Sequence, residues 1–255
     1  MKPEEIERIK GTLPTTLGSD EIRERYSREI LARSVLSARM ASASYLAKIR
    51  EVCTAMSAGE IDKADARAQL LAVLEQMGHS PRNDGGIANP ASIRRLNLIL
   101  DTQTQMASSV ARLAGQTEAT VEAFPAWELT RLETRRVPRD DWRARWRAAG
   151  SACGWQGACK DQFIALKNSP IWAALGDGAG GFDDTLGNPY PPFAYSSGLD
   201  WLDVDRETAA KLGLLDGRGA VASEPPSVAT LSPGESDIAD AIARYGFPEI
   251  GGDLT

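Results

Sequence analysis

The chain has 255 residues, with 29 basic and 35 acidic side chains and a formal net charge of −6. This length predicts one large or two small domains, and 42% hydrophobic with 25% charged residues is ordinary globular usage. No apolar run approaches the roughly 18 residues of a membrane helix, and the start, MKPEEIERIK, lacks the apolar core of a signal peptide. Three cysteines and one histidine exclude a disulfide scaffold and any site that needs two histidines of this chain.

Charge and aromatic residues divide the chain into regions. Residues 1–123 hold 16 acidic and 16 basic side chains, residues 124–200 hold nine of each, and residues 201–255 hold ten acidic and four basic. Bulk charge therefore does not indicate a broad basic surface for duplex nucleic acid. Twelve of the 16 aromatic residues, including all six tryptophans, lie between Phe124 and Trp201. We expect an Ala-rich helical region followed by a compact domain built on large rings.

The first 58 residues predict an arm and one long helix. Residues 1–18 contain two prolines and two glycines, and we expect an irregular arm there. Residues 19–58 contain neither Pro nor Gly and place apolar residues three or four apart. This spacing predicts one long helix, with a break near the small residues 41–44.

Two further helices are predicted in the front region. Asp62 or Ile61 is expected to start the first of them, and Gly78 is a good C-terminal cap. Asn89-Pro90 indicates the start of the second, with the Pro at the first helical position. Its apolar face begins at Ile93, and Gly115 is expected to end it.

The region after Phe124 predicts shorter elements. Alternating apolar residues predict a strand over 127–137, and Asp140 or Asp141 is expected to cap a helix over 142–149 that Gly150 stops. The remaining elements expected are short helices at 163–166 and 171–175, a loop at 176–198, a capped helix at 205–213, a linker at 216–236 and a last short helix at 237–245.

The sequence thus predicts an α+β fold that is predominantly α, with a region of long helices followed by a small, mixed, aromatic-rich domain. The expected parts are an N-terminal arm (1–18), a helical region (19–122), a compact mixed domain (123–215) and an acidic Gly/Pro-rich tail (216–255).

No catalytic constellation is visible in the residues. Cys153 and Cys159 are spaced more widely than the pairs of structural zinc sites, and His79 follows a helix-ending glycine, where a loop position is expected. The glycines at 176–181 lack the GK[ST] ending of a P-loop. Two acidic pairs are interpreted as a helix cap and as a solvated loop: Asp140-Asp141 and Asp183-Asp184. We therefore predict no catalytic residue, no cofactor and no bound metal.

The most conspicuous segment, residues 131–147, holds seven arginines and two tryptophans. Trp142 and Trp146 are four residues apart on the predicted helix, so both are expected in the core, with the arginines on the other faces. Arginines among aromatic residues also suit phosphate binding, so nucleic-acid contact stays open beside a protein-interface role. The expected contacts to DNA or to an acidic partner are Arg135, Arg136, Arg139, Arg143 and Arg147. The expected ring core is Trp127, Trp142, Trp146, Trp172, Tyr190, Phe193 and Tyr195.

Four segments, in this order, resemble the minor head or head morphogenesis proteins of tailed bacteriophages, the Mu-type family. They are LNLILDTQTQM (96–106), FPAWELTRLETRRVPR (124–139), LKNSPIW (166–172) and PYPPFAYSSG (189–198). The resemblance covers about residues 90–200. The histidine and the cysteine pair of the family pattern are replaced by Asp140-Asp141-Trp142 and Ser196-Ser197-Gly198, so no metal site or catalytic role is carried over.

The resemblance implies a non-enzymatic minor head protein of the virion, or of the host cytoplasm during assembly. Its expected partners are the portal or the major capsid protein; packaged DNA and further copies of the chain stay open as partners, and a membrane is not expected. Two alternatives also stay open. One is a carboxylate-dependent nuclease or toxin-type enzyme that would use Glu128, Glu133, Asp140 and Asp141. The other is a free nucleic-acid-binding module, whose affinity for DNA would fall steeply with salt.

Overall fold

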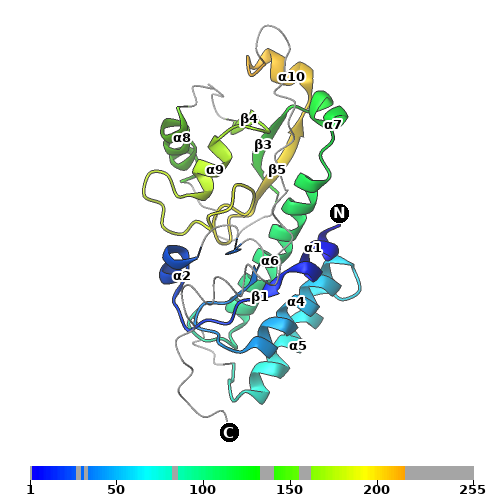
Figure 1. The fold of residues 1–255 in the computed structure, drawn as a ribbon, viewed down its shortest axis with the longest axis vertical. Helices are drawn as coiled ribbons and strands as arrows, with labels where there is room; N and C mark the ends of the chain where they lie inside the picture. The colour runs from blue at the N-terminus through cyan, green and yellow to red at the C-terminus, as the bar shows by residue number, and fades with distance from the viewer. Residues whose placement is uncertain are drawn as a thin grey trace. The chain divides into compact units, whose positions relative to one another are not determined.

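The computed structural model describes residues 2–26, 30–31, 34–81, 86–132, 141–154 and 162–215. These residues form two compact units that divide between Ala107 and Ser108, inside one long helix. Helices predominate among them, and the strands form small sheets (Figure 1). The predicted α+β, predominantly α class is confirmed. The division falls earlier in the chain than the boundary expected after residue 122.

The first unit is organised around one central helix. Its elements are α1 (Pro3–Ile9), β1 (Gly11–Thr12), α2 (Ser19–Arg25), β2 (Ser34–Val35), α4 (Ala43–Ser57), α5 (Lys63–Gln76) and the first part of α6 (Ile93–Ala114). Both α1 and α5 pack along α4 (Figure 1). The inward face of α4 buries Leu46, Ile49 and Cys53 against Leu70 and Leu74 of α5.

The expected irregular arm at 1–18 is wrong, because α1 forms there. Pro3 stands in the first turn of α1, where its missing N–H costs nothing. The Glu5 carboxylate accepts a hydrogen bond from the Lys2 backbone N–H at 2.7 Å, and Ile6 is buried. After the helix, β1 pairs in parallel with β2, with Gly11 opposite Ser34.

The single long helix expected over 19–58 is also wrong, although the break expected near residues 41–44 is confirmed, since α4 begins at Ala43. α2 ends at Arg25, β2 lies in the middle of the range, and a new helix, α4, begins after Ser42, whose Oγ accepts from the Tyr45 N–H at 3.2 Å. A distant residue holds the segment between them, because Arg95 of α6 donates to Ser37 Oγ at 2.9 Å and to the Ala38 carbonyl. Apolar spacing alone could not reveal this tertiary contact.

The expected start of α5 near Ile61 or Asp62 and its expected end at Gly78 are confirmed. The Asp62 carboxylate accepts from the N–H groups of Ala64 and Asp65 at 2.7 and 2.8 Å, and Gly78 has a φ of 84° just after the helix. The third helix begins later than expected, at Ile93, because Ser92 Oγ accepts from the Arg95 N–H and provides the cap.

The second unit contains a three-stranded antiparallel sheet. Its elements are the end of α6, α7 (Glu118–Ala123), β3 (Ala126–Arg131), α8 (Trp142–Cys153), β4 (Ile164–Leu166), α9 (Ile171–Gly176), β5 (Leu199–Val204) and α10 (Arg206–Lys211). The strand order is β4-β3-β5, and the β3–β5 register places Trp127 opposite Asp203 and Leu129 opposite Trp201.

The two faces of this sheet have different coverings. Trp127 and Trp201 lie on the face that packs against α9 and, through Trp146, against α8. On the other face, Ala126, Ile164 and Val204 form a smaller core with α10 and the residues after it. Side chains that alternate along β3 therefore contribute to two separate cores.

Three expectations in the second unit need correction. Residues 163–166 form strand β4 rather than a helix, because the Leu129 N–H donates to the Phe163 carbonyl at 2.8 Å and Ile164–Leu166 continue the pairing with β3. α8 continues through Gly150 to Cys153 and ends at Gly154, whose φ is 68°. β5 was not anticipated in the sequence. By contrast, Asp205 caps α10 as expected, and its carboxylate accepts from the Thr208 N–H at 2.8 Å.

Some expected elements lie outside the described residues. These are the end of the strand predicted over 127–137, the linker at 216–236 and the helix at 237–245.

Candidate interaction surface

The second unit is built around the indole of Trp201, which is 1% exposed. Trp127 stacks on it with ring centroids 3.8 Å apart and an interplanar angle of 11°. Trp172 meets it edge-on at 5.4 Å, and Phe193 does so at 6.0 Å. Trp146 extends the cluster by an edge contact with Trp172 at 5.5 Å. Rings from β3, α8, α9, the following loop and β5 therefore form one rigid core.

Most residues of the expected ring core are buried in the structure. Those that are buried are Trp127, Trp142, Trp146, Trp172, Tyr190 and Phe193. Tyr195 is only half-buried, which corrects its assignment to the core. Sequence reasoning missed the central residue, Trp201, although Leu199 and Trp201 alternate with polar neighbours as strand residues do.

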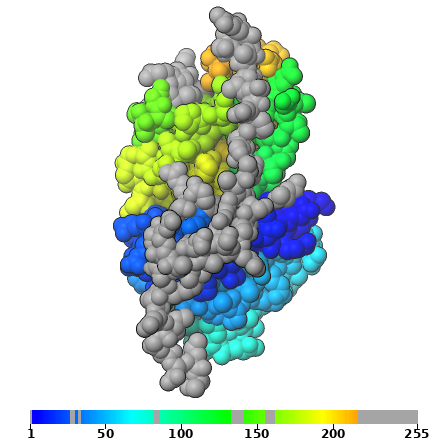
Figure 2. Space-filling view, in the orientation of Figure 1, coloured from blue at the N-terminus to red at the C-terminus, as the bar shows by residue number. Residues whose placement is uncertain are grey.

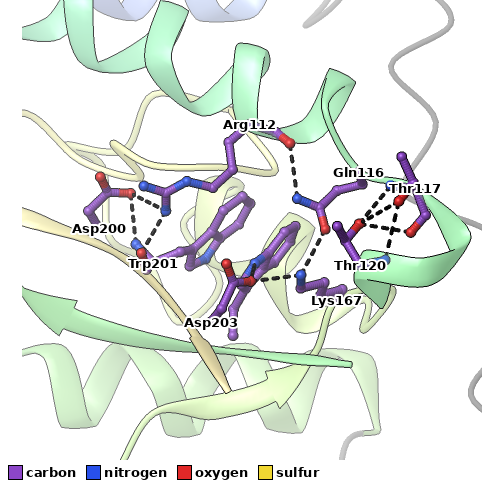
Figure 3. A network of polar contacts seen from close by, with 9 residues as sticks. Arg112, Gln116, Thr117, Thr120, Lys167, Asp200, Trp201 and Asp203 are labelled. Carbon is purple, nitrogen blue, oxygen red and sulfur yellow. Dashed lines mark hydrogen bonds and ion pairs between the residues drawn. The ribbon is translucent and has the colours of Figure 1, made fainter. Parts of the chain in front are cut away.

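A polar network around the buried Lys167 holds the end of α6 and the start of α7 on this core (Figure 3). Lys167 Nζ donates to Gln116 Oε1 at 2.7 Å, lies 2.7 Å from Asp203 Oδ1, and stands 5.2 Å from the Trp127 ring centroid. The Trp127 indole N–H donates to the same Asp203 oxygen at 3.0 Å. The lysine charge is thus compensated by a carboxylate and a ring face.

A second cation ties α6 to strand β5. Arg112 donates to the Trp201 carbonyl at 2.6 Å and pairs with Asp200 at 3.3 Å (Figure 3). Because its partners lie on one strand, this arginine positions the backbone of β5 rather than a ligand.

Helix α8 presents two chemically different faces. Its inward face consists of Trp142, Arg145, Trp146 and Ala149, all buried. Figure 2 shows α8 (green) in contact with the yellow loop that follows α9. Arg143 and Arg147 are exposed, one helical turn apart, and so lie on the same outward face. The expectation that all arginines avoid the buried face is wrong for Arg145.

Arg145 is enclosed by acidic and aromatic groups. One guanidinium nitrogen lies 2.8 Å from Asp141 and 2.8 Å from Asp184, and the group stands 4.3 Å from the centroid of the Phe182 ring. Asp141 occupies the N-cap position of α8 without a capping hydrogen bond from its side chain. The interpretation of Asp141 as a side-chain cap is therefore wrong, and so is that of Asp184 as a solvated loop residue. Both carboxylates pair with Arg145 instead.

The arginines expected to contact a partner are only partly placed. Arg143 and Arg147 lie on the outward face of α8, whereas Arg135, Arg136 and Arg139 lie outside the described residues. We call the outward face of α8 that carries Arg143 and Arg147 the α8 surface.

The carboxylates of the alternative enzyme do not come together in the described residues. Glu128 follows Trp127 on β3 and therefore points to the opposite face of the sheet from the ring core. Asp141 is engaged with Arg145, and Glu133 and Asp140 lie outside the described residues.

The cysteines among the described residues, Cys53 and Cys153, are both free thiols. Burial raises the pKa of the Cys53 thiol, which disfavours the nucleophilic thiolate. The Cys153 Sγ lies 3.6 Å from the Gly150 carbonyl, and Cys159 lies outside the described residues. Within the described ranges, no group of three or more His, Cys, Asp or Glu side chains could hold a metal ion. None of the helices described combines the length and apolar character needed to cross a membrane.

Comparisons with protein-family models, with curated proteins and with solved structures gave no match.

Proposed function

We propose that this chain is a non-enzymatic structural protein of the phage minor head class, which contacts the portal or the major capsid protein during head assembly. The observation that carries this proposal is that three of the four segments that resemble that class contribute rings to the same core. Segment 124–139 supplies Trp127, segment 166–172 supplies Trp172 and segment 189–198 supplies Phe193, and all three rings pack on Trp201.

This convergence supports a scaffold in preference to a catalytic site. In the residues that the structure describes, these three segments contribute rings and turns to one interior, and their acidic side chains do not gather in a cavity. A rigid interior of this kind suits an assembly protein, because a preformed surface loses less conformational entropy on binding.

The α8 surface is the part of this scaffold that we assign to an acidic partner. Arg143 and Arg147 present guanidinium groups on a helix whose other face is fixed by Trp142 and Trp146. Guanidinium groups suit phosphate and carboxylate oxygens equally. Packaged DNA and an acidic patch of a head protein are the two partners of matching chemistry.

Quantitative mass spectrometry of purified virus-like particles from a producing strain tests the proposal. Peptides of this chain at a fixed, low copy number per particle would support it, and nuclease digestion of DNA outside the particles before purification would serve as a control for adventitious carriage. Absence from clean particles, with the protein abundant in the lysate, would contradict a structural role.

The alternative enzyme has its own test. Cleavage of DNA by the purified protein that requires a divalent metal ion, and that is lost in Asp140→Asn or Glu133→Gln, would replace the structural proposal. Those two variants are more informative than Asp141→Asn, because Asp141 already pairs with Arg145 and its loss would disturb α8.

A further inference from the structure

Helix α1 docks on the first unit with few apolar contacts and with charged groups beneath it. Its buried side chains are Ile6 and Glu7, and Lys10, which follows the helix, is 2% exposed. Ile9, the other isoleucine of the helix, is 39% exposed. A helix of seven residues is unstable alone in water, and one buried isoleucine stabilises its docked position only weakly. The buried charged groups therefore decide how firmly α1 is held.

The Glu7 carboxyl group is fully buried, and neither of its oxygens accepts a hydrogen bond from the described residues. Lys10 Nζ lies 3.4 Å from Glu7 Oε2, which is longer than the roughly 2.7–2.9 Å of a good charge-assisted hydrogen bond. The same ammonium donates to Gln103 Oε1 of α6 at 3.0 Å. A buried carboxyl group without hydrogen-bond donors is more stable neutral than ionised, because ionisation places a poorly compensated charge in the interior.

The groups that α4 and α6 place around this pair leave Lys10 as the cation that faces Glu7 among the described residues. Arg50 of α4 donates to the Lys10 carbonyl at 2.8 Å, so its guanidinium serves the backbone at the end of α1. Burial raises the pKa of the Cys53 thiol of α4, and the charges of Glu7 and Lys10 add smaller effects, which places this thiol near the pair. Gln103 of α6 is neutral.

We propose that α1 is a pH-sensitive cover of α4, which stays docked while Glu7 carries a proton and is released when Glu7 ionises. In the released state the Glu7 carboxylate lies in water, and the face of α4 that α1 covers becomes accessible. Protonation thus controls access to that face.

The direction of this pH dependence follows from the burial of Glu7. Burial raises the pKa of the docked Glu7 carboxyl above its ordinary value of about 4.5, although the charge of Lys10 opposes this effect. The docked state therefore keeps a proton that the released state has lost. Docking is strongest below the ordinary pKa and weakens as the pH rises toward the raised pKa, by up to about tenfold per pH unit.

Hydrogen–deuterium exchange of the full-length protein at a series of pH values tests this proposal. After correction for the intrinsic pH dependence of exchange, protection of peptides covering 2–13 should fall at least about tenfold between about pH 5 and about pH 9, while α5 keeps its protection. Glu7→Gln should keep α1 protected across this range. Glu5→Gln is the matched control, because it removes the same charge from an exposed position of α1 and can still accept from the Lys2 N–H. The fall should remain in this control.

Alkylation of Cys53, read by peptide mass spectrometry, gives a second measurement. The labelling rate of the wild-type protein is divided by that of Glu7→Gln at the same pH, so that the intrinsic reactivity of the thiol cancels. This ratio should rise at least about fivefold over the same pH range, whereas the ratio for Cys153 of the second unit should stay near one. Glu7→Leu replaces Glu7→Gln in this comparison if the latter does not fold.

Three results would overturn the proposal. The first is protection of α1, or a labelling ratio for Cys53, that does not change with pH in the wild-type protein. The second is an equal loss of protection in Glu7→Gln. The third is a loss that extends equally to α5, because the whole first unit would then be opening and α1 would not be released by itself.

Discussion

Trp127 and Trp201 stack face to face at 3.8 Å, although they are not partners in the β3–β5 register. Trp127 lies opposite Asp203 and Trp201 opposite Leu129, so the two indoles are diagonal neighbours on one sheet face. Diagonal positions are within reach of aromatic side chains. The stack therefore fixes the relative position of the two strands and gives α9 and the following loop a common surface.

The first prediction concerns this stack. Trp201→Ala should lower the free energy of unfolding by about 3–5 kcal/mol, because a fully buried ring is removed and its neighbours close the cavity only in part. Chemical denaturation followed by tryptophan fluorescence measures the change. Leu202→Ala, at the next and 45% exposed position, is the control and should cost less than about 1 kcal/mol. Equal effects of the two variants would show that Trp201 does not organise the unit.

The second prediction uses the unequal exposure of an ion pair. The Lys167 side chain is 2% exposed and that of Asp203 is 47% exposed. Asp203→Asn should cost about 3 kcal/mol, because it leaves a buried ammonium without its counter-charge while keeping an acceptor for Trp127. Lys167→Met should cost less, about 1–2 kcal/mol, since the remaining carboxylate is hydrated.

A double-mutant cycle by urea denaturation checks this asymmetry. The variant carrying both changes should be more stable than Asp203→Asn alone, because the unpaired ammonium is gone. If Asp203→Asn lowers the free energy of unfolding no more than Lys167→Met does, then Gln116 and the Trp127 ring, rather than Asp203, compensate the positive charge of Lys167.

The sequence predicts those features of the fold that depend on residues close together in the chain, such as helix caps and the inward face of a helix. The cap at Asp205 and the start of α5 near Asp62 are predictable because the N–H groups that bind these carboxylates lie two or three residues away. The pair Trp142 and Trp146 was placed inward from its spacing alone. These features need no knowledge of the rest of the fold.

The sequence could not predict what distant residues decide. The helix expected over 19–58 is divided because β2 pairs with β1 and Arg95 binds the backbone near Ala38. Arg145 is buried because Asp184, 39 positions later, accepts its charge. On α8, therefore, the sequence pattern identified the exposed Arg143 and Arg147. It did not identify Arg145, the buried arginine that holds the helix in place.

The third prediction concerns the pH dependence of the first unit. Burial raises the pKa of the Glu7 carboxyl above its ordinary value of about 4.5, against the opposing effect of Lys10, whose ammonium lies 3.4 Å away. The folded state then retains a proton that the unfolded chain has lost. The stabilisation of the folded protein by this retained proton is fully present below the ordinary pKa of Glu7. It is lost as the pH rises through the raised pKa, at up to about 1.4 kcal/mol per pH unit.

Glu7→Gln mimics the protonated acid and should remove this dependence. The variant should be more stable than the wild-type protein at neutral pH, and the two should converge as the pH falls toward 4.5. Urea denaturation at a series of pH values measures the difference. Parallel curves for the two proteins would show that Glu7 stays ionised in the folded state at neutral pH.

The last prediction concerns the α8 surface. If Arg143 and Arg147 contact DNA phosphates, each contributes about 0.9 to the slope of log affinity against log salt on duplex DNA. Replacing both with Ala should therefore weaken binding and reduce the slope by about 2, as fluorescence anisotropy with a labelled duplex would measure. Arg94→Ala, at an exposed position of α6, is the matched control and should change the slope little. Binding to DNA and to head proteins that is insensitive to salt would remove the electrostatic role of this surface, because contacts between exposed charges must weaken as ions screen them.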